Sequence, residues 1–561
     1  MKLNPVILLL SLVSLIPKST TQSLPPFTIQ KIDSLFSTWN KKSSPGCAIG
    51  IIRDDSLIYS KGYGMANLES EIPITPETIF YMCSVSKQFT GYSIVLLARQ
   101  GKLKLDEDIH VYLPWLSDFK QRITVRHLLN HTSGIRDDIG LAAISGLGTD
   151  GILTQDLAIN ILKKQRSLNF SPGSQYSYSN SNYVLLAEIV KTVSGKSFRA
   201  FADSSIFRPL GMKETRFQDD YNELLKNRAF AYQRLDSNRY TNDFQNVYTL
   251  GDGGLFTNIT DMAKWVMNFY NPKAGNEKDI LQLTEKGKLT TGQEISYALG
   301  ISVDQYRGRK MYSHGGALSG YRTYVSVFPE LKLGFIVFAN IGDFSSGSRA
   351  LDLASLFIPD DSKKESTETQ SKPDSSKAVL IDTNSLKKYM GTYISDDGLQ
   401  MSFRLNNSKL YADAFGRSYL LLKGSRDTFS FYIDPAAKLS FTMNPAKEPT
   451  AFVAFGPNES HILQNYTIDT AMTDRVLFAY TGTYYSPELD CSFGIALKDH
   501  HLILTNNKYN DTPLTLAGKD HLLSDYWWLN HLAILRNNKK QITGFELNSG
   551  RIMHLRFNKV K

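Results

Sequence analysis

The chain has 561 residues, of which 42% are hydrophobic and 21% charged, and its formal net charge is +9. This length exceeds one ordinary hydrophobic core, so we expect about two to four domains. Lysine and arginine are interspersed with acidic residues and form no concentrated basic arm, a pattern that argues against a nucleic-acid partner and indicates a solvated surface.

The first predicted element is a cleavable export signal over residues 1–21. Lys2 precedes an apolar run over residues 6–16, and small polar residues follow it up to Thr21. The run is shorter than the roughly 20 apolar residues that span a bilayer, which is typical of a leader peptide. We therefore expect an exported protein, periplasmic or secreted, that is cleaved near Thr21 and keeps no integral membrane segment.

Residues 24–357 alternate helix-like and strand-like segments, which predicts an α+β domain with helices packed on a mostly antiparallel sheet. The apolar spacing after Ser84 is that of a helix packed against a core, and Gln100-Gly101 supplies its end. The other elements expected here are a helix near residues 29–39 and strands over residues 47–52, 324–328 and 333–338.

A polar segment over residues 358–378 is expected to be a flexible linker, because it has almost nothing apolar to bury. Beyond it, residues 386–393 and 477–484 share the pattern Leu-x-x-Tyr-x-Gly-Thr-Tyr. Short alternating strands broken by glycine, asparagine and aspartate follow each copy. This repeat predicts two small antiparallel, lipocalin-like β-barrels, over residues 379–470 and 471–561.

The first motif that can carry chemistry is Ser-x-x-Lys, at Ser84 and Lys87. The same pattern occurs at Ser117 and at Ser385, but only Ser84 opens a predicted buried helix. Residues i and i+3 share one face of a helix, so the lysine amine can reach the hydroxyl. Serine is a weak nucleophile that needs a base, and a desolvated lysine can serve as one. Ser84 is thus the candidate nucleophile and Lys87 its base.

Two further motifs supply partners. Tyr178-Ser-Asn180 precedes a predicted helix, and its alternate side chains point the same way, so the phenol can pass a proton and the Asn180 amide can bind a substrate carbonyl and the lysine. His314-Gly-Gly316 on a predicted edge strand lets a substrate backbone lie close. The N–H of Ala317 could then complete an oxyanion hole with that of Ser84, while His314 polarises the tyrosine or holds an anion.

These motifs give residues 24–357 a resemblance to the class C β-lactamase and penicillin-binding protein family. The segments that carry it are residues 84–90, 123–135, 178–180, 251–255 and 314–316. The resemblance implies that Ser84, Lys87 and Tyr178 form and break an acyl-enzyme. It also implies that His127 and His131, within the second segment, are core or capping residues and not metal ligands.

One departure from the family pattern concerns substrate choice. Typical β-lactamases of the family have Lys-Thr-Gly where this chain has His314-Gly-Gly316, a form closer to D-aminopeptidases, D-alanyl-D-alanine carboxypeptidases and related esterases. A histidine of ordinary pKa is mostly neutral at pH 7, so a permanent charge is missing there. Arg322 is either a substitute anion anchor or an exposed arginine at a strand end. The C-terminal barrels also resemble accessory domains of D-aminopeptidases.

The sequence therefore predicts a serine hydrolase acting through Ser84, as a D-amino-acid peptidase or aminopeptidase, a carboxypeptidase or an esterase. The alternatives are a β-lactamase and a non-catalytic cell-wall or peptide-binding homologue. The expected partner is a small-molecule or peptide substrate, including peptidoglycan fragments. The three cysteines, Cys47, Cys83 and Cys491, cannot all pair and stand in no metal-binding spacing, so neither metal nor cofactor is predicted.

Overall fold

The computed structural model describes residues 24–560 with gaps at 148–150, 238 and 361–382. Further gaps in the C-terminal part are 415–416, 425, 432–436, 444–447, 456–459, 467, 469–471, 507, 519 and 527. The predicted leader over residues 1–21 and most of the predicted linker lie outside the described residues. Within the described ranges, no helix has the length and apolar character to cross a bilayer, and Cys47, Cys83 and Cys491 are free thiols.

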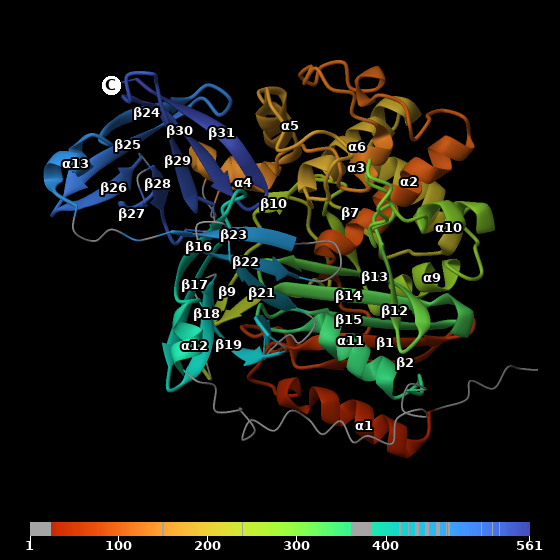
Figure 1. Ribbon diagram of the computed structural model, residues 1–561. Coiled ribbons are helices and arrows are strands. Elements are labelled where there is room, and N and C mark those ends of the chain that lie inside the picture. Colours follow the sequence, from red (N-terminus) through yellow and green to blue (C-terminus); the bar gives the residue numbers. More distant parts are fainter. Residues whose placement is uncertain are drawn as a thin grey trace, which may run out of the picture.

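A six-stranded antiparallel sheet forms the centre of the N-terminal part (Figure 1). Its order is β12 (Ser302–Tyr306), β13 (Arg309–Leu318), β14 (Tyr321–Phe328), β15 (Leu333–Ala339), β1 (Cys47–Arg53) and β2 (Ser56–Tyr63). Every residue of β15 and nearly every residue of β1 is buried. These two strands are continuous apolar runs because helices cover both faces of the sheet.

Helices α1 (Pro26–Phe36) and α11 (Ser346–Ser355) cover one face of the sheet, and α9 (Ile259–Asn268) covers the other. Behind α9 lie α2 (Lys87–Arg99) and α6 (Asn180–Ser194), which pack on each other. Residues 87–97 are all buried, so α2 is enclosed around its whole circumference. The predicted α+β layering is confirmed, although α1 begins and ends about three residues before the predicted helix.

The smaller elements complete this part of the chain. The helices are α3 (Val125–Leu129), α4 (Asp138–Ala142), α5 (Gln155–Lys163), α7 (Phe198–Ala202), α8 (Arg208–Leu210) and α10 (Glu277–Leu283). The short strands are β3 (Met65–Asn67), β4 (Ile72–Pro73), β5 (Phe80–Tyr81), β6 (Leu153–Thr154), β7 (Arg216–Phe217), β8 (Tyr232–Arg234), β9 (Tyr240–Asn242), β10 (Val247–Tyr248) and β11 (Leu255–Thr257).

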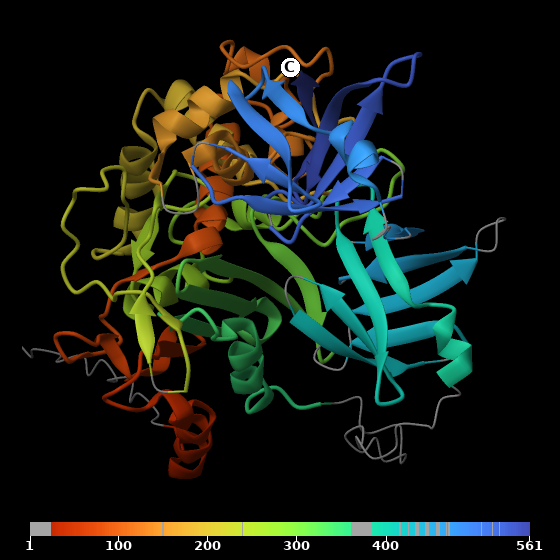
Figure 2. The ribbon, with the colours of Figure 1, turned by 90° about the vertical axis from the view of Figure 1, so that its left-hand side faces the viewer.

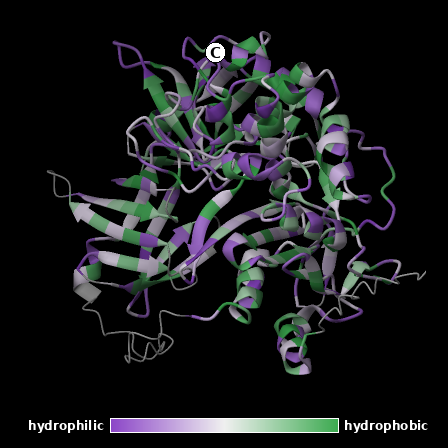
Figure 3. Ribbon diagram, turned by 90° about the vertical axis from the view of Figure 1, so that its right-hand side faces the viewer, coloured by the Kyte–Doolittle hydropathy of each residue, from purple (hydrophilic) through white to green (hydrophobic). Residues whose placement is uncertain are grey.

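Two closed antiparallel barrels of eight strands follow, as the repeat predicts. Barrel 1 comprises α12 (Thr383–Lys387), β16 (Gly391–Ser395), β17 (Gln400–Asn406), β18 (Lys409–Ala414), β19 (Arg417–Lys423), β20 (Thr428–Phe431), β21 (Lys438–Met443), β22 (Pro449–Ala454) and β23 (Ser460–Tyr466). Barrel 2 comprises α13 (Asp474–Phe478), β24 (Gly482–Ser486), β25 (Cys491–Lys498), β26 (His501–Thr505), β27 (Thr512–Ala517), β28 (His521–Leu523), β29 (His531–Arg536), β30 (Ile542–Ser549) and β31 (Ile552–Lys559). Figure 3 shows hydrophobic and hydrophilic residues alternating along many strands.

The repeated motif makes the same contact in each barrel. The Tyr393 hydroxyl donates to the carbonyl of Tyr389 at 3.0 Å, and the Tyr484 hydroxyl donates to that of Tyr480 at 2.6 Å. Each bond ties the first strand of a barrel to the residues that lead into it. The sequence repeat thus corresponds to the same hydrogen bond in both barrels.

Barrel 2 is anchored on the N-terminal part by a buried arginine. Arg136, whose side chain is 0% exposed, donates to Glu488 Oε2 at 3.0 Å, to the carbonyl of Met553 at 2.9 Å and to that of His554 at 3.1 Å. A buried charge is tolerated only when it is paired and hydrogen-bonded, so these contacts fix where barrel 2 sits. Figure 2 shows both barrels side by side against the N-terminal part.

Candidate active site

Ser84 lies in the sharp turn that leads into α2. Residues Cys83–Ser86 form one 3-10 turn, and Cys83 has a left-handed backbone with φ of +50°. That conformation is costly for a residue with a side chain, so the surrounding packing must hold it. Cys83 and Val85 are buried, whereas Ser84 is partly exposed and lines a cavity. The turn therefore presents the hydroxyl to the cavity.

Lys87 is fully buried beneath this hydroxyl. Its Nζ donates to Ser84 Oγ at 3.2 Å, to Asn180 Oδ1 at 2.9 Å and to the main-chain carbonyl of Asp252 at 2.8 Å. An ammonium has three hydrogens, so each of them has an acceptor here. The spacing of the first motif thus brings amine and hydroxyl together, and the second motif supplies another acceptor.

Asp137 fixes the orientation of Asn180. The backbone N–H and the Nδ2 of Asn180 both donate to Asp137 Oδ2, at 2.8 and 3.0 Å. Because a carboxylate only accepts, the amide nitrogen must face Asp137 and the amide oxygen must face Lys87. Asp137 was not among the predicted site residues, because its only signal in the sequence is an acidic pair directly after Arg136.

The ring of Tyr178 stands over the lysine. Its centroid lies 4.9 Å from Lys87 Nζ and 4.2 Å from the ring of His131. Burial, and then the charge of Lys87, hold the pKa of His131 well below its ordinary value, so a neutral imidazole supports the phenol. Among the described residues the Tyr178 hydroxyl has no hydrogen bond to Ser84; such bonds are often long in unliganded sites and tighten on binding.

His314 faces a different tyrosine from the one that the sequence suggested. The Tyr297 hydroxyl lies 2.8 Å from His314 Nε2, and Nδ1 lies 2.6 Å from the carbonyl of Gly315. Since a carbonyl only accepts, Nδ1 carries the hydrogen and Nε2 accepts from Tyr297. Burial, and then the charge of Lys87, lower the pKa of His314 to about 4. The imidazole is therefore neutral at pH 7 and supplies no charge to an anion.

The second glycine of the motif allows β13 to pass close to the turn before Ser84. A Cβ on Gly316 would lie 2.3 Å from Thr323 Oγ1 and 2.4 Å from the carbonyl of Met82. The strand is not the edge of the sheet, contrary to expectation, because β12 lies outside it. However, β12 pairs only with residues 309–313, so the edge from His314 onward, with exposed Ala317, faces the cavity.

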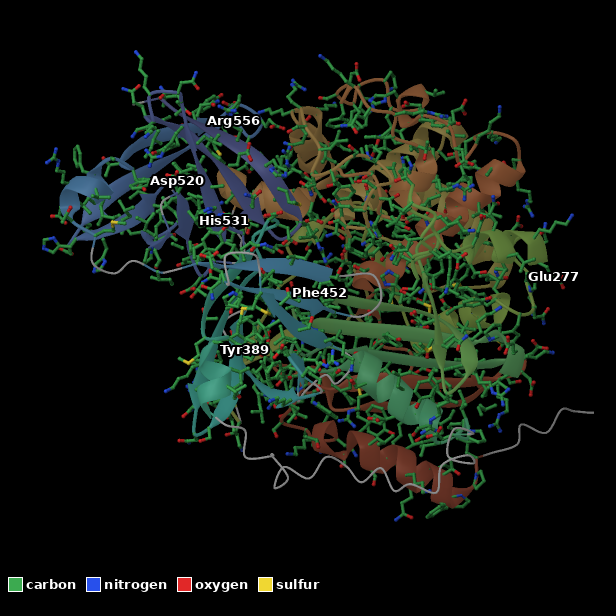
Figure 4. The ribbon with its side chains drawn as sticks, in the orientation of Figure 1. Glu277, Tyr389, Phe452, Asp520, His531 and Arg556 are labelled. Atoms are coloured by element: carbon green, nitrogen blue, oxygen red, sulfur yellow. The ribbon has the colours of Figure 1, made fainter. Side chains whose placement is uncertain are left out.

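One cavity of about 1380 Å³ joins all three motifs. Ser84, Tyr178 and His314 line it, whereas Lys87 lies under its floor. Both barrels complete its wall, barrel 1 with Phe452 and Ile462 and barrel 2 with the turn at residues 549–553. Figure 4 labels Phe452 where β22 meets the N-terminal part. The cavity is thus bounded by all three parts of the described chain.

Two arginines line this cavity. Arg322 donates from one nitrogen to the carbonyls of Ser319 and Tyr321, at 2.6 and 2.7 Å. Arg551, in the turn of barrel 2, stacks over the ring of Tyr178 at 4.7 Å from its centroid. Of these two arginines, only Arg322 was predicted from the sequence as a candidate anion anchor.

The two predicted structural histidines are placed as expected. His127 closes the capping box of α3 with Thr124, and His131 is fully buried. Among the described residues, no three His, Cys, Asp or Glu side chains meet in an arrangement that could hold a metal ion.

The fold and this site define the class of active-site serine proteins to which β-lactamases and penicillin-binding proteins belong. Residues 32–356 match the Beta-lactamase family, and the chain belongs to that family.

Relatives and structural neighbours agree with this assignment. A D-aminopeptidase of Gluconobacter oxydans (strain 621H) is 30% identical over 322 residues, which cover 56% of this chain and 59% of that protein. The chain thus matches about three fifths of the length of this relative. The octameric penicillin-binding protein homologue from Pyrococcus abyssi has a TM-score of 0.54 at 24% identity, covering 78% of this chain and 98% of that one. The D-amino acid amidase from Ochrobactrum anthropi SV3 complexed with D-phenylalanine has a TM-score of 0.51 at 19% identity, covering 59% and 99%. At these identities the neighbours show the shared fold.

Proposed function

We propose that the protein is a serine hydrolase that cleaves the amide bond after a D-amino acid through an acyl-enzyme on Ser84. The observation that carries this proposal is the 3.2 Å contact between Lys87 Nζ and Ser84 Oγ at a cavity that Tyr178 also lines. An activated nucleophile is recognised by such a hydrogen bond to a base that a third group orients. Asn180, held by Asp137, is that third group.

The chemistry follows from these positions. Lys87 acts as the base in its neutral amine form: Ser84 Oγ attacks the carbonyl carbon while its proton passes to the lone pair of Lys87 Nζ, and the N–H groups of Ser84 and Ala317 hold the oxyanion. Collapse of the tetrahedral intermediate breaks the C–N bond, and the proton is relayed through Tyr178 to the departing nitrogen. A water molecule then adds to the acyl-enzyme by the reverse relay, which releases the acid and restores the Ser84 hydroxyl.

The preference for D-amino acid substrates rests on similarity and on His314. The D-aminopeptidase of Gluconobacter oxydans supports a peptidase that acts on an N-terminal D-residue. The neutral imidazole of His314 supports peptide or ester substrates over β-lactams, because it offers no permanent charge to a carboxylate at that strand. Peptidoglycan fragments, which carry D-residues, are the expected natural source.

A substrate panel on the parent and Ser84→Ala tests the proposal. The panel contains D-alanyl and L-alanyl p-nitroanilide, a short nitrophenyl ester and a chromogenic cephalosporin. We expect the D-anilide to be turned over best, and Ser84→Ala to lose turnover and fluorophosphonate labelling while keeping its melting temperature. Labelling of Ser84→Ala at the parent rate would refute the mechanism. Cephalosporin turnover far above the others would indicate a β-lactamase, and slow labelling without turnover a binding protein.

We also propose that the protein acts outside the cytoplasm. The support is the apolar run at residues 6–16 after Lys2. N-terminal sequencing of the protein recovered from the periplasm or medium should begin close after Thr21. Recovery of a cytoplasmic protein that retains residues 1–21 would contradict this proposal.

A further inference from the structure

The turn between β30 and β31 is bound tightly to the N-terminal part. Asn169 Nδ2 donates to the carbonyl of Arg551 at 2.9 Å, and Asn169 Oδ1 accepts from the backbone N–H of Met553 at 2.8 Å. Arg136 adds a bond to the carbonyl of Met553. Gly550, at φ of +59°, makes the tight turn that precedes Arg551. The backbone of Arg551 is therefore fixed on both sides, so the position from which its side chain extends is fixed as well.

That side chain reaches the reacting groups of the site. Its guanidinium lies 4.7 Å above the centroid of the Tyr178 ring and 3.7 Å from Asp137 Oδ2. The Asp137 oxygen already accepts two hydrogen bonds from Asn180. At 3.7 Å the arginine is attracted to this carboxylate but not hydrogen-bonded to it. The side chain is also 49% exposed, on a residue that lines the cavity.

None of the Arg551 side-chain donors makes a hydrogen bond within the described residues, whereas Arg136 and Arg322 each commit donors to other groups. Arg136 is buried and donates hydrogen bonds across the interface between the N-terminal part and barrel 2. Arg322 spends donors on two carbonyls. Across the described part of the chain, the Arg551 guanidinium makes no hydrogen bond, and its ion pair with Asp137 Oδ2 is loose at 3.7 Å. A guanidinium carries five N–H groups that suit a carboxylate. His314 is neutral, so Arg551 brings to this cavity the charge that the sheet motif lacks.

We propose that Arg551 is a specificity-determining residue that binds a carboxylate on the leaving-group side of the substrate. The carboxylate is assigned to the leaving-group side of the substrate because Tyr178 passes the proton to the departing nitrogen and Arg551 lies over the ring of the same tyrosine. The preferred substrates are then short peptides, a D-residue followed by one residue with a free C-terminal carboxylate. This inference rests on the proposed function and narrows its substrate class.

A matched substrate pair tests the inference on the full-length protein. D-alanyl-glycine and D-alanyl-glycinamide differ only in the terminal carboxylate, so the ratio of their kcat/KM values isolates its recognition. We expect the parent to favour the dipeptide by about tenfold or more, the range of a charge-assisted hydrogen bond. Arg551→Gln should bring the ratio close to one, and Arg551→Lys should retain part of it.

The control is Arg556→Gln on β31. Arg556 is exposed, donates to Asn558 Oδ1 at 2.9 Å and does not line the cavity, so its loss removes the same charge from the same hairpin (Figure 4). This variant should keep the parent ratio. An Arg551→Gln variant that slows both substrates equally would show a structural role and overturn the inference, as would a parent without preference. Failure of the proposed function is distinguishable, because the parent would then turn over neither D-alanyl-glycine nor D-alanyl-glycinamide.

Discussion

Replacing Gly316 by alanine should damage catalysis far more than replacing its neighbour Gly315. The added Cβ at residue 316 would lie 2.4 Å from the carbonyl of Met82, and real Cβ atoms essentially never come within 3.0 Å of another heavy atom. The backbones at Gly316 and Met82 must therefore separate by at least about 0.6 Å. Met82 stands two residues before Ser84, so this shift is passed to the nucleophile.

The size of the effect follows from that displacement. A misplacement of about 1 Å at a reacting group costs about 100-fold in rate, so a shift of this order should lower kcat/KM by about 10- to 100-fold. Crowding of a packed site costs about 1–3 kcal/mol of stability as well. At Gly315 the nearest atom to an added Cβ is 3.5 Å away, an ordinary contact. Gly315→Ala should therefore keep most of the parent activity.

The assay compares the two alanine variants with the parent in three measurements. These are the rate of fluorophosphonate labelling, kcat/KM for the D-alanyl anilide, and the melting temperature. We expect slow labelling and slow turnover for Gly316→Ala alone. The reasoning is refuted if Gly316→Ala labels at the parent rate, or if Gly315→Ala loses as much activity as Gly316→Ala.

Three further expectations concern other parts of the site. Tyr178→Phe keeps the ring but removes the proton relay, so kcat for the anilide should fall by about 100- to 10,000-fold; an unchanged kcat would exclude this tyrosine as the proton donor. The folded state holds the pKa of His314 at about 4, below the 6.5 of the unfolded chain, so the stability linked to this residue is present above pH 6.5 and is lost as the pH falls towards 4. The free energy of unfolding should therefore fall by about 2 kcal/mol between pH 7 and pH 5 because of His314, and a His314→Gln variant should lack this contribution to the pH dependence of its urea midpoint. If the urea midpoints of parent and variant depended on pH to the same extent, the buried neutral state of His314 would be contradicted. Glu488→Gln leaves Arg136 as an unpaired buried charge and should lower the free energy of unfolding by about 3–5 kcal/mol, whereas Asp490→Asn, at an exposed ion pair, should change the urea midpoint little. Similar effects of the two substitutions would disprove the anchoring role of the Arg136–Glu488 pair.

The sequence was most informative where the relevant contacts are local or repeated. The pair Ser84 and Lys87 is read from helical spacing, and their contact at 3.2 Å lies within one turn. The two barrels follow from a repeated motif whose tyrosines make the same bond in each copy. The central sheet follows from apolar runs such as β15, which are buried over their full length.

Contacts made by docking left no comparable signal. Arg551 reaches Tyr178 only because barrel 2 seats its turn on Asn169, and no local pattern distinguishes this arginine from the others. The carbonyl of Asp252 that binds Lys87 is an atom that every residue has, so its role depends on where the backbone passes. The partner of His314 was likewise unpredictable, because Tyr297 approaches from a separate loop.

The division of the cavity wall among three structural units, the N-terminal part and the two barrels, has an evolutionary consequence. The bond-breaking groups stand on one unit, whereas Phe452 and Arg551 are contributed by two others. Mutational effects at separated positions tend to add independently. Substitutions in either barrel can therefore change substrate specificity while the catalytic groups stay unchanged. Gene fusion or exchange of a whole barrel would change the specificity in a single step.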